Sequence, residues 1–202
     1  MPRLPDPDLQ ERILDAAQKL WKKGAEKTLT MRAVAEAAGT NTPAVYRRFR
    51  NREDILRAML RRIQQDVVDA LQPCSCPEEA CERYLEFAVN HAHEYELFYT
   101  HAYELSHPAR SDHASPLREH RPTMQFMETK LAERLGGTAA DHTRLSLALW
   151  TMAHGTAMLL ISRAIPAAHV AELRSVFTVA VETLINNSSG LFGPELREGS
   201  RD

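Results

Sequence analysis

The sequence predicts an all-α protein built from two domains. Apolar residues recur at intervals of three and four along most of the 202 residues, which is the period of a helix with one buried face. Aromatic residues make up only 6% of the chain and lack the alternating pattern expected of β-sandwiches and barrels. Since 44% of the residues are hydrophobic, the chain can bury a substantial core, which argues against disordered and collagen-like structures.

Two helices are expected before the first tight turn. The first covers about residues 8–23 and ends at Gly24, because its apolar residues form a single stripe: Leu9, Ile13, Ala17, Leu20 and Trp21. The second begins after Thr30, whose hydroxyl can accept a hydrogen bond from the first free amides of the helix. Gly39 then supplies the permissive backbone that a sharp turn needs.

A short third helix is expected to follow this turn almost at once, from Ala44 to Phe49. Thr42 is the predicted N-cap, and Pro43 occupies the first helical position, where the missing N–H has no cost. The side chains predicted to be buried around this helix are Val34, Ala38, Val45 and Phe49.

A long fourth helix is expected over about residues 52–72. Asn51 can cap it, and Pro73 ends it. Apolar residues recur at every fourth position between these two: Ile55, Met59, Ile63, Val67 and Leu71. We expect this helix to join an N-terminal domain, residues 1–52, to a C-terminal helical bundle, residues 53–202.

The bundle is expected to contain a helical pattern from Pro77 to about Leu105, a loop from Ser106 to Pro116, and three further helices over about residues 116–135, 139–164 and 167–187. The last two helices carry more apolar residues than one stripe can hold. The simplest place for the surplus is a two-fold helical interface, so the sequence predicts a homodimer formed through these two helices.

Residues 30–49 read as a helix, a glycine turn and a second short helix, which is the geometry of a helix-turn-helix. The second helix would expose Thr42, Tyr46 and Arg47 to a major groove, with arginines beyond them for phosphates. The charge distribution also favours a DNA partner for this segment. The first 65 residues hold 14 Lys and Arg against 8 Asp and Glu, although the whole chain has a net charge of -2. The sequence therefore predicts double-stranded DNA as the partner of the N-terminal domain.

The segments "ILDAAQKLWKKGAEKTLTMRAVAEAAG" and "TPAVYRRFRNREDILRAML" resemble the TetR family of transcriptional regulators. The resemblance implies a dimeric repressor, not an enzyme, that binds palindromic operator DNA and releases it when a small, largely apolar effector binds the C-terminal domain. It implies no cofactor. The family usually has Lys where this chain has Arg52, which keeps the charge but changes the hydrogen-bond geometry. The predicted DNA-binding residues are Thr30, Thr40, Thr42, Pro43, Ala44, Tyr46, Arg47, Arg48 and Arg52.

The C-terminal segment "ALWTMAHGTAMLLISR" is similar to one subfamily of TetR C-terminal domains through Trp150, His154 and Gly155. Mixed aromatic, Met and His faces of these helices can line an apolar cavity with a few polar anchors, although the same residues suit an ordinary core. His154 is the first choice, because an imidazole within an apolar helix needs a partner. The candidate ligand-binding residues are Phe87, His91, Tyr99, Tyr103, Met127, Trp150, His154 and Met158, with Tyr84, Phe98, His101 and Met124 as further possibilities.

An alternative interpretation is a histidine-rich metal-dependent enzyme or metal sensor. Six of the nine histidines lie close together in sequence: His91, His93, His101, His107, His113 and His120. Their spacing forms no paired metal motif, so we expect no metal site. Cys74, Cys76 and Cys81 could act as redox sensors or simply fill a turn.

The chain is expected to stay in the cytoplasm. Its first residues carry acids and prolines where a signal peptide would be apolar. The most apolar stretch, Leu145 to Ile161, is shorter than the roughly 20 residues of a membrane span, so we expect a buried helix there and no membrane partner.

Overall fold

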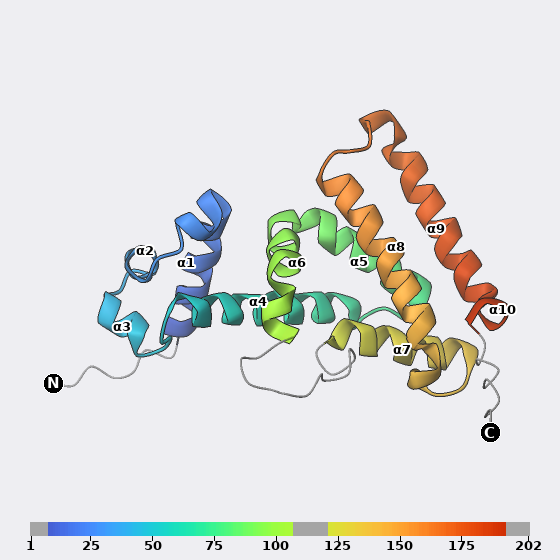
Figure 1. Ribbon diagram of the computed structural model, residues 1–202, viewed down its shortest axis with the longest axis horizontal. Helices are drawn as coiled ribbons and strands as arrows, with labels where there is room; N and C mark the ends of the chain where they lie inside the picture. Colours follow the sequence, from blue (N-terminus) through green and yellow to red (C-terminus); the bar gives the residue numbers. More distant parts are fainter. Residues whose placement is uncertain (1–7, 107–120, 193–202) are drawn as a thin grey trace, which may run out of the picture. The chain divides into compact units, whose positions relative to one another are not determined.

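The computed structural model describes residues 8–106 and 121–192, and side chains within residues 8–101 and 121–190. Every regular element in these ranges is helical, which confirms the all-α class (Figure 1). The elements in chain order are α1 Leu9–Gly24, η1 Ala25–Lys27, α2 Met31–Ala37, α3 Thr42–Tyr46, α4 Arg52–Leu71, α5 Pro77–Asn90, α6 Ala92–Ser106, α7 Pro122–Leu135, η2 Ala139–His142, α8 Thr143–Ile161, η3 Ala167–His169, α9 Val170–Asn186 and α10 Ser188–Phe192.

The helices form two compact units. Unit 1 contains α1 to α3, α4 as far as Ile63, and α6 from Glu96 onward. Unit 2 contains α4 from Gln64, α5, the start of α6 as far as Tyr95, and α7 to α10. Two helices, α4 and α6, therefore contribute residues to both units.

The core of unit 1 is made mainly by the apolar faces of α1 to α4, with Leu29 from the segment before α2 and Leu97 from α6. Its side chains are almost completely buried, among them Ile13, Leu29, Val34, Val45, Ile55 and Met59. The predicted burial of Val34, Ala38, Val45 and Phe49 is confirmed. Because α2 and α3 each bury one apolar stripe in this core, their opposite faces remain available to solvent.

Side-chain caps fix where the short helices of unit 1 begin. The Thr30 hydroxyl accepts a hydrogen bond from the Ala33 amide at 3.1 Å, as predicted. The predicted cap of α3 is wrong by one residue: Asn41, not Thr42, is the N-cap, and its Oδ1 accepts from the Ala44 amide at 2.9 Å. Asparagine and threonine are both good N-caps, and here the extended backbone at Asn41 decides between them.

The helical pattern predicted from Pro77 to about Leu105 is two helices. The backbone of His91, with φ −119° and ψ 43°, leaves the helical region between α5 and α6. The His91 ring stacks on Phe87 with a centroid separation of 4.5 Å, and the His91 amide still donates to the Phe87 carbonyl. No Gly or Pro marks this break, so the apolar period alone could not reveal it.

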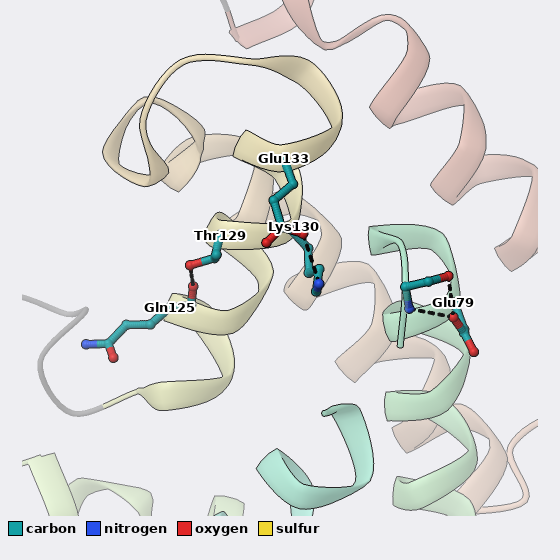
Figure 2. Close-up of polar contacts among 6 residues, drawn as sticks. Glu79, Gln125, Thr129, Lys130 and Glu133 are labelled. Atoms are coloured by element: carbon teal, nitrogen blue, oxygen red, sulfur yellow. Dashed lines mark hydrogen bonds and ion pairs between the residues drawn. The ribbon is translucent and has the colours of Figure 1, made fainter. Parts of the chain in front are cut away.

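Unit 2 is a bundle in which α5, α7 and α8 pack against one another and α9 lies beside α8 (Figure 1). Its most buried apolar side chains are Leu85, Leu131, Leu145, Phe177 and Ile185. Some polar contacts lie on the outside of the bundle. Figure 2 shows the Thr129 hydroxyl donating to the Gln125 carbonyl on α7, and Lys130 paired with Glu133 at 2.9 Å.

Two helix boundaries in unit 2 differ from those predicted. Helix α7 begins at Pro122 because Arg121 has a non-helical backbone, whereas its start was expected at about residue 116. The predicted loop over Ser106 to Pro116 lies outside the described residues, apart from Ser106. At the other end, the chain forms the additional short helix α10 where the last predicted helix was expected to end.

Candidate DNA interface and internal cavity

The α2–α3 segment of unit 1 forms a helix-turn-helix. Gly39 has a φ of +65°, so the turn uses a backbone conformation that side-chain-bearing residues rarely adopt. The Thr40 amide donates to the Ala35 carbonyl at 2.9 Å, which closes the end of α2, and Asn41 then starts α3. The turn thus places a short, capped helix directly after α2.

Helix α3 buries one side and exposes the other. Val45 is completely buried and Phe49 is 7% exposed, whereas the Tyr46 side chain between them is 54% exposed. Val45 and Phe49 occupy the positions that face the core, so the Tyr46 ring is directed away from it. Tyr46 therefore lies on the surface together with the exposed residues Pro43, Arg47 and Arg48.

The other predicted DNA-binding residues differ in exposure. Thr30 is exposed, and Thr40, Thr42 and Arg52 are half-buried. Ala44 is only 4% exposed and packs in the core of unit 1, so its side chain does not belong to this surface. Arg50, which is not among the predicted DNA-binding residues, is also exposed.

Arginines surround the start of α4, and their partners differ. Arg52 pairs with its neighbour Glu53 at 3.5 Å, and Arg57 pairs with Asp54 at 2.9 Å. The Asp54 amide in turn donates to the Asn51 side chain at 2.9 Å, which anchors the predicted cap of this helix. These are solvent-accessible pairs of low stability, so a phosphate can compete for the guanidinium groups.

Unit 2 contains a cavity between α5, α7 and α8, with the end of α4 at one side. Each helix contributes one face, because its lining residues are spaced by one, three or four positions. The lining residues are Leu71, Ala80, Cys81, Tyr84, Thr123, Met124, Met127, Ser146, Leu149, Trp150 and Ala153. The cavity measures about 30 Å³ and is partly open to solvent.

The Ser146 hydroxyl is an unusual feature of this cavity. Ser146 is 1% exposed, and within the described part of the chain its Oγ has no hydrogen-bond partner. A serine or threonine hydroxyl on a helix commonly donates to the carbonyl four residues earlier, as the exposed Thr151 does to Leu147 on the same helix. Ser146 instead leaves a hydroxyl unsatisfied in an apolar surrounding, which is costly unless something else binds it.

A chain of hydrogen bonds connects the cavity wall to His154. The Tyr84 hydroxyl lies 3.1 Å from the Tyr95 hydroxyl, which lies 2.7 Å from Nδ1 of His154. Burial, together with the positive charge of Arg121, lowers the pKa of His154 below its usual value. The neutral ring suits this network, because Nδ1 can then accept a hydrogen bond from Tyr95. The expected partner of the His154 imidazole is therefore a tyrosine.

Trp150 forms a flat wall of the cavity. Its indole stacks on the His154 ring at 5.9 Å, and the Arg121 guanidinium lies 4.9 Å from the ring centroid on a cation–π contact. Both contacts hold the indole in place.

The structure brings together only part of the predicted ligand set. Met127 and Trp150 line the cavity, as do Tyr84 and Met124, and His154 reaches it through two tyrosines. Phe87, His91 and Met158 belong to unit 2 but are not in the lining, and Tyr99 belongs to unit 1, where its ring lies edge-on to Phe98. The side chain of Tyr103 lies outside the described residues.

Sequence reasoning missed the small and polar members of the lining. Ser146, Leu149, Trp150 and Ala153 share one face of α8, so the spacing that marks Trp150 also marks the others. The same holds for Ala80, Cys81 and Tyr84 on α5. The sequence gives no sign that this face of α8 lines a cavity between helices instead of packing closely against them.

Burial favours the protonated thiol at two of the three cysteines of unit 2. It raises the pKa of Cys81 to about 12, and burial followed by the nearby Glu79 carboxylate raises the pKa of Cys74. Because neutral thiols are poor nucleophiles and poor metal ligands, Cys74 and Cys81 act here as small apolar groups. Cys76 caps α5 by accepting from the Glu79 amide at 3.5 Å.

Within residues 8–106 and 121–192, no group of three or more His, Cys, Asp or Glu side chains could hold a metal ion. Of the six clustered histidines, His107, His113 and His120 lie outside the described residues. Among the described helices, none combines the length and the apolar character needed to cross a membrane.

Comparison with known proteins agrees with the geometry of both units. Residues 13–59 match the family model described as bacterial regulatory proteins, tetR family, and residues 78–184 match that of the tetracyclin repressor-like C-terminal domain. No curated protein matches the sequence.

Solved structures show that the whole fold is shared. A protein of unknown function from Rhodococcus sp. RHA1 is 22% identical, with a TM-score of 0.68 over 93% of this chain and 98% of its own. A TetR-like transcriptional regulator from the same organism is 21% identical, with a TM-score of 0.61 over 95% of this chain and 100% of its own. Since one family model alone spans more than half of the sequence and a second covers the helix-turn-helix, this chain belongs to the TetR family of DNA-binding transcriptional regulators.

Proposed function

We propose that this regulator is a repressor that binds palindromic operator DNA as a homodimer and releases it when a small, largely apolar effector occupies the cavity of unit 2. The observation that carries the proposal is the exposed surface of the helix-turn-helix, with Tyr46 on α3 and Arg47 and Arg48 directly after it, while the opposite face of α3 is buried.

The proposed DNA contacts follow from the chemistry of this surface. Arg47 can donate two hydrogen bonds to a guanine edge, and Tyr46 and Thr42 can contact neighbouring bases or methyl groups. Arg48, Arg50 and Arg52 are suited to the flanking phosphates, which supply affinity without reading sequence. Thr30 and Thr40 lie at either end of α2, and Pro43 lies at the start of α3, where a phosphate backbone would pass.

Dimerisation is supported by apolar side chains that the single chain leaves exposed. Val176 and Val179 on α9 are each 59% exposed, and Leu159 on α8 is 40% exposed. A two-fold contact through these helices would bury all three side chains on each protomer. Such a dimer can present two recognition helices to half-sites about 34–36 Å apart on one side of the duplex.

Effector binding is supported by the cavity. Its lining is mostly apolar, with a few hydroxyl groups, which is the usual composition of a small-molecule site. An effector that favours a conformation unable to span the two half-sites would release the operator, and the shift can be no larger than its preference for that conformation.

The test is selection of duplexes from a random library by the purified protein, followed by binding measurements across a salt series. Enrichment of a palindrome, bound by one dimer with steep salt dependence, is the expected result. The variant Tyr46→Ala should lose the preference for the selected duplex. A protein that enriches no sequence, and binds all duplexes equally weakly, would contradict the proposal.

A further inference from the structure

We infer that the cavity of unit 2 takes an uncharged, single-ring molecule carrying one hydroxyl or similar hydrogen-bonding group, and that the Ser146 hydroxyl binds this group. The inference rests on the proposed function only in that such a molecule would be the effector. It concerns the chemical class of the ligand, which neither the fold nor the family determines.

The lining favours an uncharged ligand. It contains no Asp, Glu, Lys, Arg or His among the described residues, and its polar groups are the hydroxyls of Tyr84, Thr123 and Ser146 and the neutral thiol of Cys81. A charged group would lose its hydration here without gaining a partner of opposite charge from the lining itself. The Arg121 guanidinium lies on the Trp150 ring and is not part of the lining.

The size of the space limits the ligand to one ring at most. The cavity measures about 30 Å³. A cavity that holds benzene in another protein measures roughly 150 Å³, so a ring can enter only if side chains of the lining move. Met124 and Met127 are unbranched, adaptable side chains, and we expect their movement to make room for one ring but not for a fused polycyclic molecule.

The position of the ligand's hydrogen-bonding group follows from the one hydroxyl of the lining that is both buried and without a hydrogen-bond partner among the described residues. Tyr84 already bonds Tyr95, whereas the Oγ of Ser146 has no partner within the described ranges. Ser146 lies one turn before Trp150 on the same face of α8. A ring packed along the indole would therefore carry its polar substituent toward Ser146.

The experiment compares three probes with the full-length chain: phenol, toluene and benzoate. Phenol and toluene have nearly the same size, so they differ mainly in the hydroxyl, while benzoate adds a charge. Dissociation constants from ligand-observed NMR titrations are expected to be measurable for phenol and toluene and much weaker for benzoate. In Ser146→Ala, phenol should bind about 3- to 10-fold more weakly, and the affinity for toluene should be unchanged or slightly higher.

Two further variants keep the test decisive. Thr129→Ala removes an exposed hydroxyl on α7 that donates to its own helix (Figure 2), and it should leave both affinities unchanged. Ala153→Leu narrows the cavity and should weaken phenol and toluene alike. The inference is overturned if neither ring binds, if benzoate binds best, or if Ser146→Ala weakens phenol and toluene equally.

Binding of the selected duplex by the same preparations separates this inference from the proposed function. A protein that binds its duplex but none of the rings contradicts the inference alone. A protein that binds phenol with the Ser146 dependence, but no specific duplex, supports the inference for the cavity and contradicts the proposed function.

Discussion

At the scale of single residues, Arg47 and Arg52 should contribute to DNA binding in different ways. Arg47 is exposed at the C-terminal end of α3, where it can reach a base, so Arg47→Ala should weaken binding to the selected duplex by about 1–3 kcal/mol and relax specificity at one position. Arg52 lies at the start of α4 beside Glu53, so Arg52→Ala should weaken all duplexes alike. Fluorescence anisotropy with selected and scrambled duplexes measures both effects.

The salt dependence of binding provides the control for this pair. Loss of a phosphate contact at Arg52 should reduce the slope of log affinity against log salt by about one, because one fewer counterion is released. Replacement of Arg47 should change the slope less if it meets a base. The reverse pattern would mean that the two arginines have exchanged roles.

His154 should make the stability of the protein depend on pH. Its pKa is lowered in the folded chain by burial and then by Arg121, whereas in the unfolded chain it returns to about 6.5. As the pH falls below that value, the unfolded chain binds a proton that the folded chain resists, so the free energy of unfolding decreases until the pH reaches the lowered pKa. His154→Gln, which cannot titrate but can still bond Tyr95, should reduce the loss of thermal stability between about pH 7.5 and pH 5.

The matched control is His93→Gln, which replaces an exposed histidine on α6. This variant should keep the pH dependence of the wild-type melting temperature. If both variants give the same curve as the wild type, His154 does not set the acid sensitivity, and other groups of the chain must do so.

At the scale of secondary-structure elements, the start of α3 depends on one side chain. Asn41→Ala removes the hydrogen bond to the Ala44 amide and should cost about 1 kcal/mol of stability. Thr42→Ala replaces the residue first expected to be the cap and should cost clearly less. In a Trp150→Phe background, the fluorescence of Trp21, the other tryptophan of the chain, reports urea unfolding of unit 1. Equal losses in the two variants would argue against the assigned cap.

Most elements were predictable because their signals are local. Stripes of apolar residues, caps at Thr30 and Asn51, and the turn at Gly39 each depend on a few neighbouring residues, and the structure has them as expected. The break at His91 was not predictable, because no glycine or proline marks it. Helical period identifies which face of a helix is apolar, but not where a second helix interrupts it.

The DNA surface and the cavity also differ in how far the sequence could predict them. The DNA surface belongs to one short segment, so the spacing of the apolar Val45 and Phe49 was enough to predict that Tyr46 lies on the exposed side. The cavity joins residues from α4, α5, α7 and α8. Its aromatic and methionine members could be guessed by residue type, but Ser146 could be found only after three helices had been placed together.

At the scale of the whole molecule, the exposed apolar side chains of α8 and α9 predict an assembly that one polar substitution can break. Leu159→Glu or Val176→Glu would bury a charge without a partner at the proposed two-fold interface, so either variant should sediment as a monomer at concentrations where the wild type is a dimer. A monomer has one recognition helix and should also lose the steep preference for a palindrome, while still binding half-sites weakly.

Leu135→Glu is the control for this prediction, because Leu135 is 39% exposed, almost the same as Leu159, but lies at the end of α7. It makes the same chemical change away from the proposed interface and should leave the dimer intact. A dimer that survives both Leu159→Glu and Val176→Glu would place the interface elsewhere. Loss of the dimer in Leu135→Glu as well would mean that the substitutions act through unfolding of unit 2, which circular dichroism of each variant would detect.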